Sequence, residues 1–183
     1  MKIRELLEQG KAALPQAEHE AYWLLMHLLQ CSKSRLLQRG AENAAMEIVV
    51  AYQEALQRRT AGEPLQYILG RQEFMSLSFR VDKRVLIPRW DSEILVETAL
   101  KLLPQKPCKA ADIATGSGAL GISIAHYAPQ AMVHACDISA DALAVAKENA
   151  ANLGLCERVK FYLGDLAAPL PDTYDLIISN PPY

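Results

Sequence analysis

An asparagine, two prolines and a tyrosine follow an apolar run in the stretch DLIISNPPY. Asn180 precedes a proline, which favours extended backbone, and Pro181 and Pro182 stiffen the chain that follows. The Asn180 side chain and the Pro181 carbonyl can therefore act as two fixed hydrogen-bond acceptors, with the ring of Tyr183 beside them. Such a set suits a planar NH₂ group, whose lone pair it would orient toward an electrophilic methyl. Taken alone, a proline-rich turn leaving a strand explains the stretch equally well.

A glycine-rich turn lies upstream, in the stretch ADIATGSGALGISIA. Residues Gly116 to Gly121 fit the pattern GxGxxG between a predicted strand and a predicted helix, and Asp137 closes the next predicted strand roughly 20 residues later. Glycines let a ligand approach the backbone, a helix start offers N–H groups, and a carboxylate can accept from ribose hydroxyls. The alternative is a tight turn with no ligand. The pairing of the GxGxxG turn with Asp137 favours a nucleotide-like ligand instead.

The residues around this turn bear on the choice of ligand. In a dinucleotide site the first glycine usually follows the strand immediately, whereas here Ala114 and Thr115 precede Gly116. Asp112 brings a negative charge near the turn, which suits an ammonium group better than a pyrophosphate. S-adenosylmethionine carries an α-amino group, a sulfonium and a ribose, and no phosphate.

The elements that would position these residues alternate between strand and helix. Apolar residues at helical spacing predict helices up to about Leu69, including one over residues 45–59. Residues 77–81 alternate like a strand, and 85–87 is a second apolar run, so the two predict a small hairpin. Further on, the pattern predicts helices over 91–103, 118–127 and 139–154, and strands over 109–114, 132–138, 159–163 and 174–179. This alternation is typical of a parallel sheet with helical cover.

Composition limits the function classes. The chain has 183 residues, is 51% apolar and carries a formal net charge of −2, which argues against a broad nucleic-acid surface. The sequence predicts no membrane span and no targeting peptide. The four cysteines are scattered without a CxxC pair, and the histidines show no ligand spacing, so we expect a cytoplasmic protein with no metal site.

Several stretches, taken in order and spacing, resemble class I adenosylmethionine-dependent methyltransferases that modify amino nitrogens: DIATGSG, ACDIS, YLGD and DLIISNPPY. RRTAGEPLQYILGRQEF and VLIPRWDSEILVE narrow this to a resemblance to the release factor glutamine methyltransferase family (PrmC/HemK), over nearly the whole chain. The resemblance implies methyl transfer to the side-chain nitrogen (N5) of the glutamine in the GGQ motif of peptide chain release factors. It also implies an α/β protein with three parts: a helical, substrate-recognition domain over 1–72, a hairpin linker over 73–90, and a Rossmann-like methyltransferase domain over 91–183.

The resemblance assigns roles residue by residue. It implies that the cofactor turn comprises Ala114, Thr115, Gly116, Ser117 and Gly118. Asp137 matches the ribose carboxylate, and Asp165 and Leu166 match the pair near the adenine. The motif that binds the substrate amide comprises Asn180, Pro181, Pro182 and Tyr183, with Asn180 and Pro181 as the catalytic acceptors and Asn180 also close to the cofactor.

Four positions depart from the family pattern. Ala114 stands where glycine is common, although a methyl group there need not block binding. Trp90 stands where proline is usual, and Ser92 replaces threonine but keeps its hydroxyl. Leu166 replaces a commonly aromatic residue, which implies weaker stacking on adenine.

The resemblance also implies a strand order of 3-2-1-4-5-7-6, of which four strands are present. Residues 166–173 must then cross strands 2 and 1, a path of about 22 Å against a maximal reach of about 29 Å. We therefore expect a nearly extended loop there, without a full helix. We also expect a chain truncated just after the NPPY motif, which alone has no measurable methyltransferase activity and tends to self-associate through its outer strand.

Other functions share part of the signal. A nicotinamide-dependent dehydrogenase would use the glycine turn and Asp137 but gives no reason for the NPPY motif. An N6-adenine methyltransferase of nucleic acid would use that motif on the planar amino group of adenine, although the helical region and low basicity favour a protein substrate. We expect release factors as partners, with no membrane and no direct nucleic-acid contact.

Overall fold

This computed structural model describes residues 1–171 and 173–181. The chain divides into two compact units, one over Met1–Leu69 and one from Gly70 onward. Each unit has its own apolar core. Within the described residues, no helix combines the length and the apolar character needed to cross a membrane.

The first unit is helical, as the apolar spacing predicts. It contains α1 (Ile3–Ala13), α2 (Glu18–Leu28), α3 (Lys33–Gln38), α4 (Met46–Thr60) and α5 (Leu65–Leu69), with a short 3₁₀ turn at Arg39–Ala41. Each of the longer helices buries one face, and Tyr52 of α4 lies fully buried with its hydroxyl donating to the Ala21 carbonyl at 3.3 Å. The buried face of α4 includes Val49, whereas its neighbour Ile48 is only half-buried.

The second unit begins with an antiparallel hairpin of β1 (Arg71–Phe74) and β2 (Leu77–Arg80). The expected strand at residues 77–81 is therefore present, but its partner precedes it, and the expected second strand at residues 85–87 was wrong. The two-residue turn consists of Met75 and Ser76, with φ of 50° and 57°. Both residues have positive φ, as in the turns that favour hairpins, but neither is the glycine or asparagine that would have marked the turn.

Four parallel strands form the main sheet in the order β5-β4-β3-β6. Their bounds are β3 (Cys108–Ile113), β4 (Ala131–Asp137), β5 (Val159–Leu163) and β6 (Leu176–Ser179). The α/β fold class and the strand order expected from the sequence are confirmed. Because the strands are parallel, their carboxyl ends share one edge of the sheet, and the chain segments of the predicted site leave from that edge.

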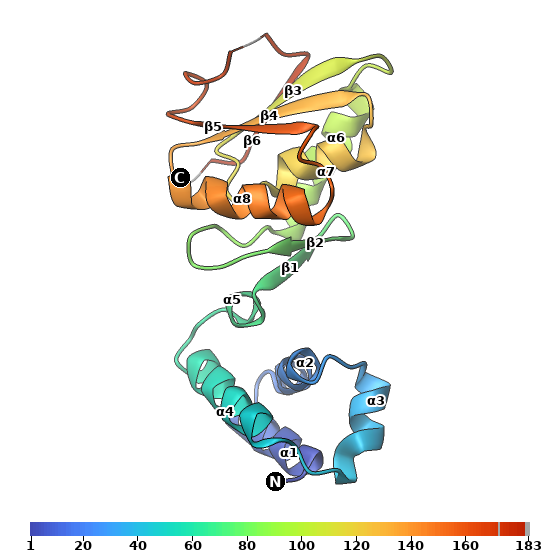
Figure 1. The fold of residues 1–183 in the computed structure, drawn as a ribbon, viewed down its shortest axis with the longest axis vertical. Coiled ribbons are helices and arrows are strands. Elements are labelled where there is room, and N and C mark those ends of the chain that lie inside the picture. Colours follow the sequence, from blue (N-terminus) through green and yellow to red (C-terminus); the bar gives the residue numbers. More distant parts are fainter. Residues whose placement is uncertain (172, 182–183) are drawn as a thin grey trace. The chain divides into compact units, whose positions relative to one another are not determined.

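One face of this sheet is covered by α6 (Glu93–Leu102), α7 (Ala119–Tyr127) and α8 (Ala140–Asn152), as Figure 1 shows. A 3₁₀ turn, Trp90–Ser92, leads into α6. The apolar core between sheet and helices includes Val96, Ile122 and Val133.

The crossover from β5 to β6 contacts residues of β4 that point away from this core. His134 Nδ1 and the Tyr174 hydroxyl lie 2.9 Å apart, and the Cys136 thiol donates to the Leu166 carbonyl at 2.9 Å. The described residues of the crossover, 164–171 and 173–175, form turns and bends without a helix. The absence of a helix agrees with the expectation from chain reach, although the turns make the loop less extended than expected.

Candidate active site

The turn between β3 and α7 is built on left-handed backbone. Gly116 has φ of 56° and Gly118 has φ of 82°, a region that favours glycine. A Cβ on Gly118 would also lie 2.5 Å from the Ile122 side chain, whereas a Cβ on Gly116 would meet no atom of the described residues within 4 Å. Gly118 is thus needed for packing as well as conformation, while Gly116 leaves open space in which a ligand can approach the backbone.

Ala114 shares this conformation, with φ of 59°. An L-residue in the left-handed region costs roughly 1–2 kcal/mol, because its Cβ crowds the following carbonyl. The structure therefore gives a physical reason for the glycine that the family resemblance leads one to expect here: glycine would adopt the same backbone without that cost.

Asp112, near the carboxyl end of β3, holds this turn in place through its side chain. It is 1% exposed, and its Oδ2 accepts hydrogen bonds from the Thr115 hydroxyl at 2.6 Å and the Gly121 N–H at 2.9 Å. A Cβ on Gly121 would lie 2.9 Å from that oxygen, so glycine permits the close approach of α7 to β3. Burial raises the pKa of Asp112 to about 6, because desolvation disfavours its charged form.

Asp137, the last residue of β4, binds the turn through its carboxylate. Its Oδ2 accepts from the Gly116 N–H at 2.8 Å, and its Oδ1 accepts from the Ser139 N–H at 2.9 Å. Each carboxylate oxygen has a second acceptor site, so the predicted bonds to ribose hydroxyls remain compatible with these contacts. Asp137 also positions the turn, a role that the sequence did not predict.

Asn149 of α8 is a further positioning residue that sequence reasoning missed. It is 1% exposed, and its amide bonds to both backbone groups of Arg80: the Arg80 N–H donates to Oδ1 at 2.6 Å, and Nδ2 donates to the Arg80 carbonyl at 3.0 Å. Nδ2 also donates to the Ser117 carbonyl at 2.9 Å. Asn149 thereby ties the glycine turn to β2. The only signal in the sequence was a polar residue on the apolar face of a predicted helix.

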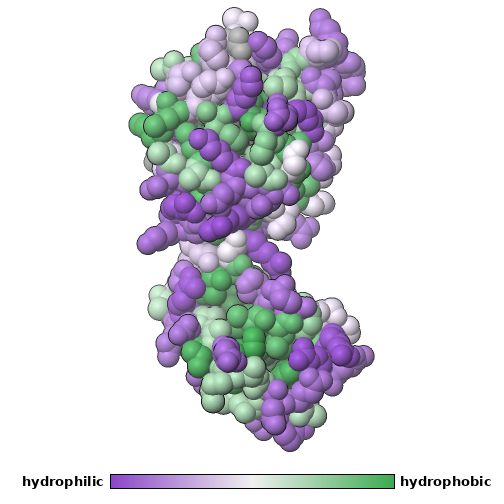
Figure 2. Space-filling model, in the orientation of Figure 1, coloured by the Kyte–Doolittle hydropathy of each residue, from purple (hydrophilic) through white to green (hydrophobic). Residues whose placement is uncertain are grey.

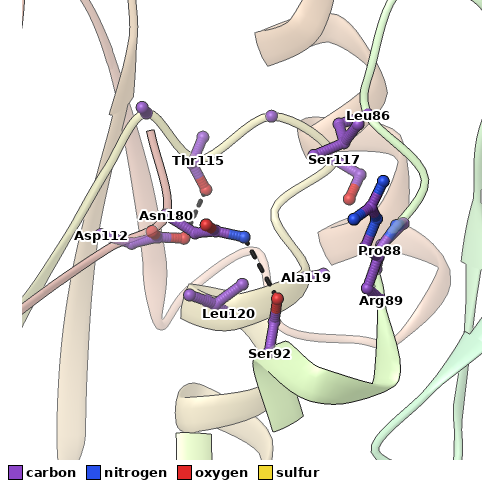
Figure 3. A pocket seen from close by; sticks show the side chains of 12 residues that line it. Leu86, Pro88, Arg89, Ser92, Asp112, Thr115, Ser117, Ala119, Leu120 and Asn180 are labelled. Carbon is purple, nitrogen blue, oxygen red and sulfur yellow. Dashed lines mark hydrogen bonds between the residues drawn. The ribbon is translucent and has the colours of Figure 1, made fainter. Parts of the chain in front are cut away.

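A cavity lies over the turn (Figure 3). Besides Asp112 and the turn it is lined by α7 and by the segment that precedes α6; its residues are Leu86, Pro88, Arg89, Ser92, Asp112, Ala114, Thr115, Gly116, Ser117, Ala119, Leu120 and Asn180. The stretch from Leu86 to Ser92 belongs to the VLIPRWDSEILVE motif, to which sequence reasoning gave no role in the site. Figure 3 shows the Arg89 guanidinium turned toward Ser117.

Asn180, which follows β6, lies in the same cavity as the predicted cofactor turn. Its Nδ2 donates to the Ser92 hydroxyl at 3.1 Å. Pro181 follows it and is exposed. The predicted substrate residues Pro182 and Tyr183 lie outside the described residues.

The remaining predicted cofactor residues are not among those that line this cavity. Gly118 begins α7, and Asp137 bonds to the turn from β4. Asp165 and Leu166 follow β5 and are exposed, Leu166 by 62% of its surface. The Gly164 N–H donates to the Asp137 carbonyl at 3.0 Å, so this loop starts beside the β4 end.

Comparison with known proteins shows which family this chain resembles. Residues 4–70 match the model of the PrmC N-terminal domain, and residues 91–183 match the methyltransferase small domain. A release factor glutamine methyltransferase from Moorella thermoacetica is 46% identical over 181 residues, covering 97% of this chain and 62% of the relative. One from Deinococcus radiodurans is 38% identical over 190 residues, covering 100% of this chain and 67% of the relative.

This chain belongs to the release factor glutamine methyltransferase family. It spans about three fifths to two thirds of the length of these curated relatives. The fold is shared with a Pyrococcus abyssi tRNA (uracil-54, C5)-methyltransferase in complex with S-adenosyl-L-homocysteine, at a TM-score of 0.50 and 17% identity, over 61% of this chain and 28% of that one.

The residues of the site fit S-adenosylmethionine, the cofactor of such methyltransferases. The open space over Gly116 admits a ligand against the backbone. The guanidinium of Arg89 and the carboxyl of Asp112 line one cavity, and these groups complement the carboxylate and ammonium of an amino-acid end. Asp137, beside the turn, has acceptor sites left for a ribose.

Proposed function

We propose that this protein transfers a methyl group from S-adenosylmethionine to the side-chain amide nitrogen (N5) of the glutamine in the GGQ motif of peptide chain release factors. The observation that carries the proposal is that Asn180 lies in one cavity with the glycine turn. An acceptor for an amide and a binding turn for a methyl donor are thereby adjacent.

The turn from Ala114 to Gly118 and Asp137 hold the cofactor in this proposal, with Asp165 and Leu166 beside its adenine. When bound, the cofactor supplies an electrophilic methyl group on its sulfonium. A carboxamide nitrogen is a poor nucleophile because its lone pair is delocalised, so the protein's contribution is mainly alignment of nitrogen and methyl at about 3 Å.

Asn180 and Pro181 supply that alignment. The Asn180 side-chain oxygen and the Pro181 carbonyl accept from the two hydrogens of the substrate amide, and Pro182 and Tyr183 complete its binding site. The same two oxygens stabilise the positive charge that develops on the nitrogen as the methyl arrives. The amide proton then leaves to water.

The helical unit is assigned to substrate recognition. Its surface supports contact with a protein, because Figure 2 shows hydrophobic residues gathered among hydrophilic ones on the visible face of that unit. Its large exposed apolar side chains include Trp23, Leu37, Met46 and Val50. A release factor acts in translation termination, so the proposal places this protein in the cytoplasm without direct nucleic-acid binding.

Methyl transfer from labelled S-adenosylmethionine tests the proposal. Because the chain spans only part of its relatives, the assay uses a chimaera in which residues 1–183 replace the matched segment of the Moorella thermoacetica relative. We expect label on a release factor and none on the same factor with its GGQ glutamine replaced. Asn180→Ala should reduce the rate on the order of 100-fold, by loss of one preorganised polar group.

Two results would contradict the proposal. Label on adenine-containing DNA in place of the release factor would indicate the nucleic-acid methyltransferase. Calorimetric binding of NAD by residues 1–183, without binding of S-adenosylmethionine, would indicate the dehydrogenase.

A further inference from the structure

Ser92 and Asn180 come from motifs that are 88 residues apart, yet their side chains are hydrogen-bonded. Asn180 Nδ2 donates to the Ser92 hydroxyl at 3.1 Å, and Ser92 is only 8% exposed. Figure 3 shows the nitrogen end of the Asn180 amide turned toward Ser92 and its oxygen end turned away. Both side chains line the proposed active-site cavity.

The hydroxyl of Ser92 is available for this contact because it does not cap the helix that it precedes. In this chain Ser32 and Ser139 are ordinary caps: each has extended backbone and accepts from an N–H three residues later. Ser92 also precedes a helix, α6, but has helical backbone, with φ of −76° and ψ of −11°, and makes no capping bond. The next residue, Glu93, accepts from the Met75 N–H at 2.7 Å, so the start of α6 is anchored to the hairpin turn.

The backbone directly before Asn180 is also held. Ser179 pairs with Ile113 at the end of β6, and the Ser179 hydroxyl donates to the Ile113 carbonyl at 2.8 Å. From this anchored strand end, the direction of the Asn180 amide depends on the torsions of its side chain. Its two ends differ chemically, because one accepts hydrogen bonds and the other donates them.

We propose that Ser92 is a positioning residue that binds the nitrogen end of the Asn180 amide and thereby presents the oxygen end to the substrate amide. This inference rests on the proposed function for its catalytic meaning, but the contact itself can be tested without substrate. Ser92 touches neither reacting atom in this account. Its hydroxyl determines which end of Asn180 faces them.

Nuclear magnetic resonance of the 183-residue chain labelled with ¹⁵N-asparagine tests the contact. The sequence has four asparagines, and Asn180→Asp identifies the side-chain signal of Asn180 by its loss. We expect that signal to exchange with water several-fold more slowly than that of Asn152, which is exposed. The buried side-chain amide of Asn149 reports whether each variant remains folded.

Ser92→Thr and Ser92→Val form a matched pair, because threonine and valine side chains have similar shapes and only threonine carries a hydroxyl. We expect Ser92→Thr to preserve the slow exchange of Asn180, and Ser92→Val and the smaller Ser92→Ala to raise it to the rate of Asn152. The Asn149 signal should be unchanged in all three. Slow exchange of Asn180 in a folded hydroxyl-free variant, or fast exchange in Ser92→Thr, would overturn the proposal.

Kinetics of the chimaera connect the contact to catalysis. Ser92→Ala should lower kcat about tenfold, as expected for loss of one orienting hydrogen bond, with little change in the KM for the release factor. Ser92→Thr should restore kcat. An unchanged kcat in Ser92→Ala would refute the catalytic part of the inference. If the wild-type chimaera methylates no release factor although the Asn180 signal behaves as expected, the proposed function fails and the contact stands.

Discussion

Replacement of Asn149 by alanine should destabilise the second unit strongly. The change removes three hydrogen bonds in a residue that is 1% exposed, and leaves the Arg80 N–H, the Arg80 carbonyl and the Ser117 carbonyl without this partner. A buried polar group that loses its partner costs about 1–3 kcal/mol. Because the three bonds share one side chain and are not additive, we expect a loss of about 3–5 kcal/mol in the free energy of unfolding.

Urea unfolding followed by circular dichroism measures this loss. Asn152→Ala is the matched control, because Asn152 is exposed at the end of the same helix and should cost less than about 0.5 kcal/mol. Asn149→Asp should be at least as harmful as alanine, since a carboxylate would face two carbonyl oxygens. The transition of the helical unit should stay in place in every variant. A loss below about 1 kcal/mol for Asn149→Ala, or an equal loss for Asn152→Ala, would refute the role assigned to this side chain.

Three further predictions follow from the turn and its neighbours. Ala114→Gly should raise the stability of the second unit by about 0.5–1 kcal/mol in urea unfolding, because glycine removes the cost of positive φ; a loss of stability would contradict this. Asp112 has a pKa of about 6 when folded and an ordinary one when unfolded, so the folded state binds the proton more tightly. Stability should therefore fall by about 3 kcal/mol as the pH rises from about 3 to about 7, and Asp112→Asn should abolish that slope; an equal slope in the variant would be inconsistent with it. Asp137→Ala should weaken binding of S-adenosylmethionine by about 1.5–3 kcal/mol in calorimetry and also lower stability, because the Gly116 and Ser139 N–H groups lose their acceptor; an unchanged Kd would rule out the ribose contact.

Features encoded by local sequence were predictable. The strands of the main sheet are apolar runs bounded by turn residues, so their existence and their parallel pairing were correctly predicted. The glycine turn was visible because positive φ at Gly116 and Gly118 demands a residue type that the sequence shows directly. The hairpin was misplaced because its turn, Met75-Ser76, reaches positive φ without glycine or asparagine.

Contacts between distant residues were not predictable in this way. The bond of Asn180 to Ser92 spans 88 residues and that of Asn149 to Arg80 spans 69, and neither changes the local pattern around its residues. A buried asparagine on a helix can satisfy its amide in many ways, and only the packing of α8 against β2 decides which. Sequence therefore predicted residues for ligand contact, which remain predictions, while the contacts that orient them required the fold.

Hydrogen exchange of residues 1–183 with and without S-adenosylmethionine, read by mass spectrometry, tests the central claim most directly. If the cavity over the glycine turn holds the cofactor beside Asn180, the cofactor should slow exchange in peptides that cover residues 112–121 and 176–180. Peptides from residues 1–69 should exchange at the same rate with and without it. Saturating S-adenosylmethionine that leaves 112–121 unprotected, or that protects only the helical unit, would contradict the account.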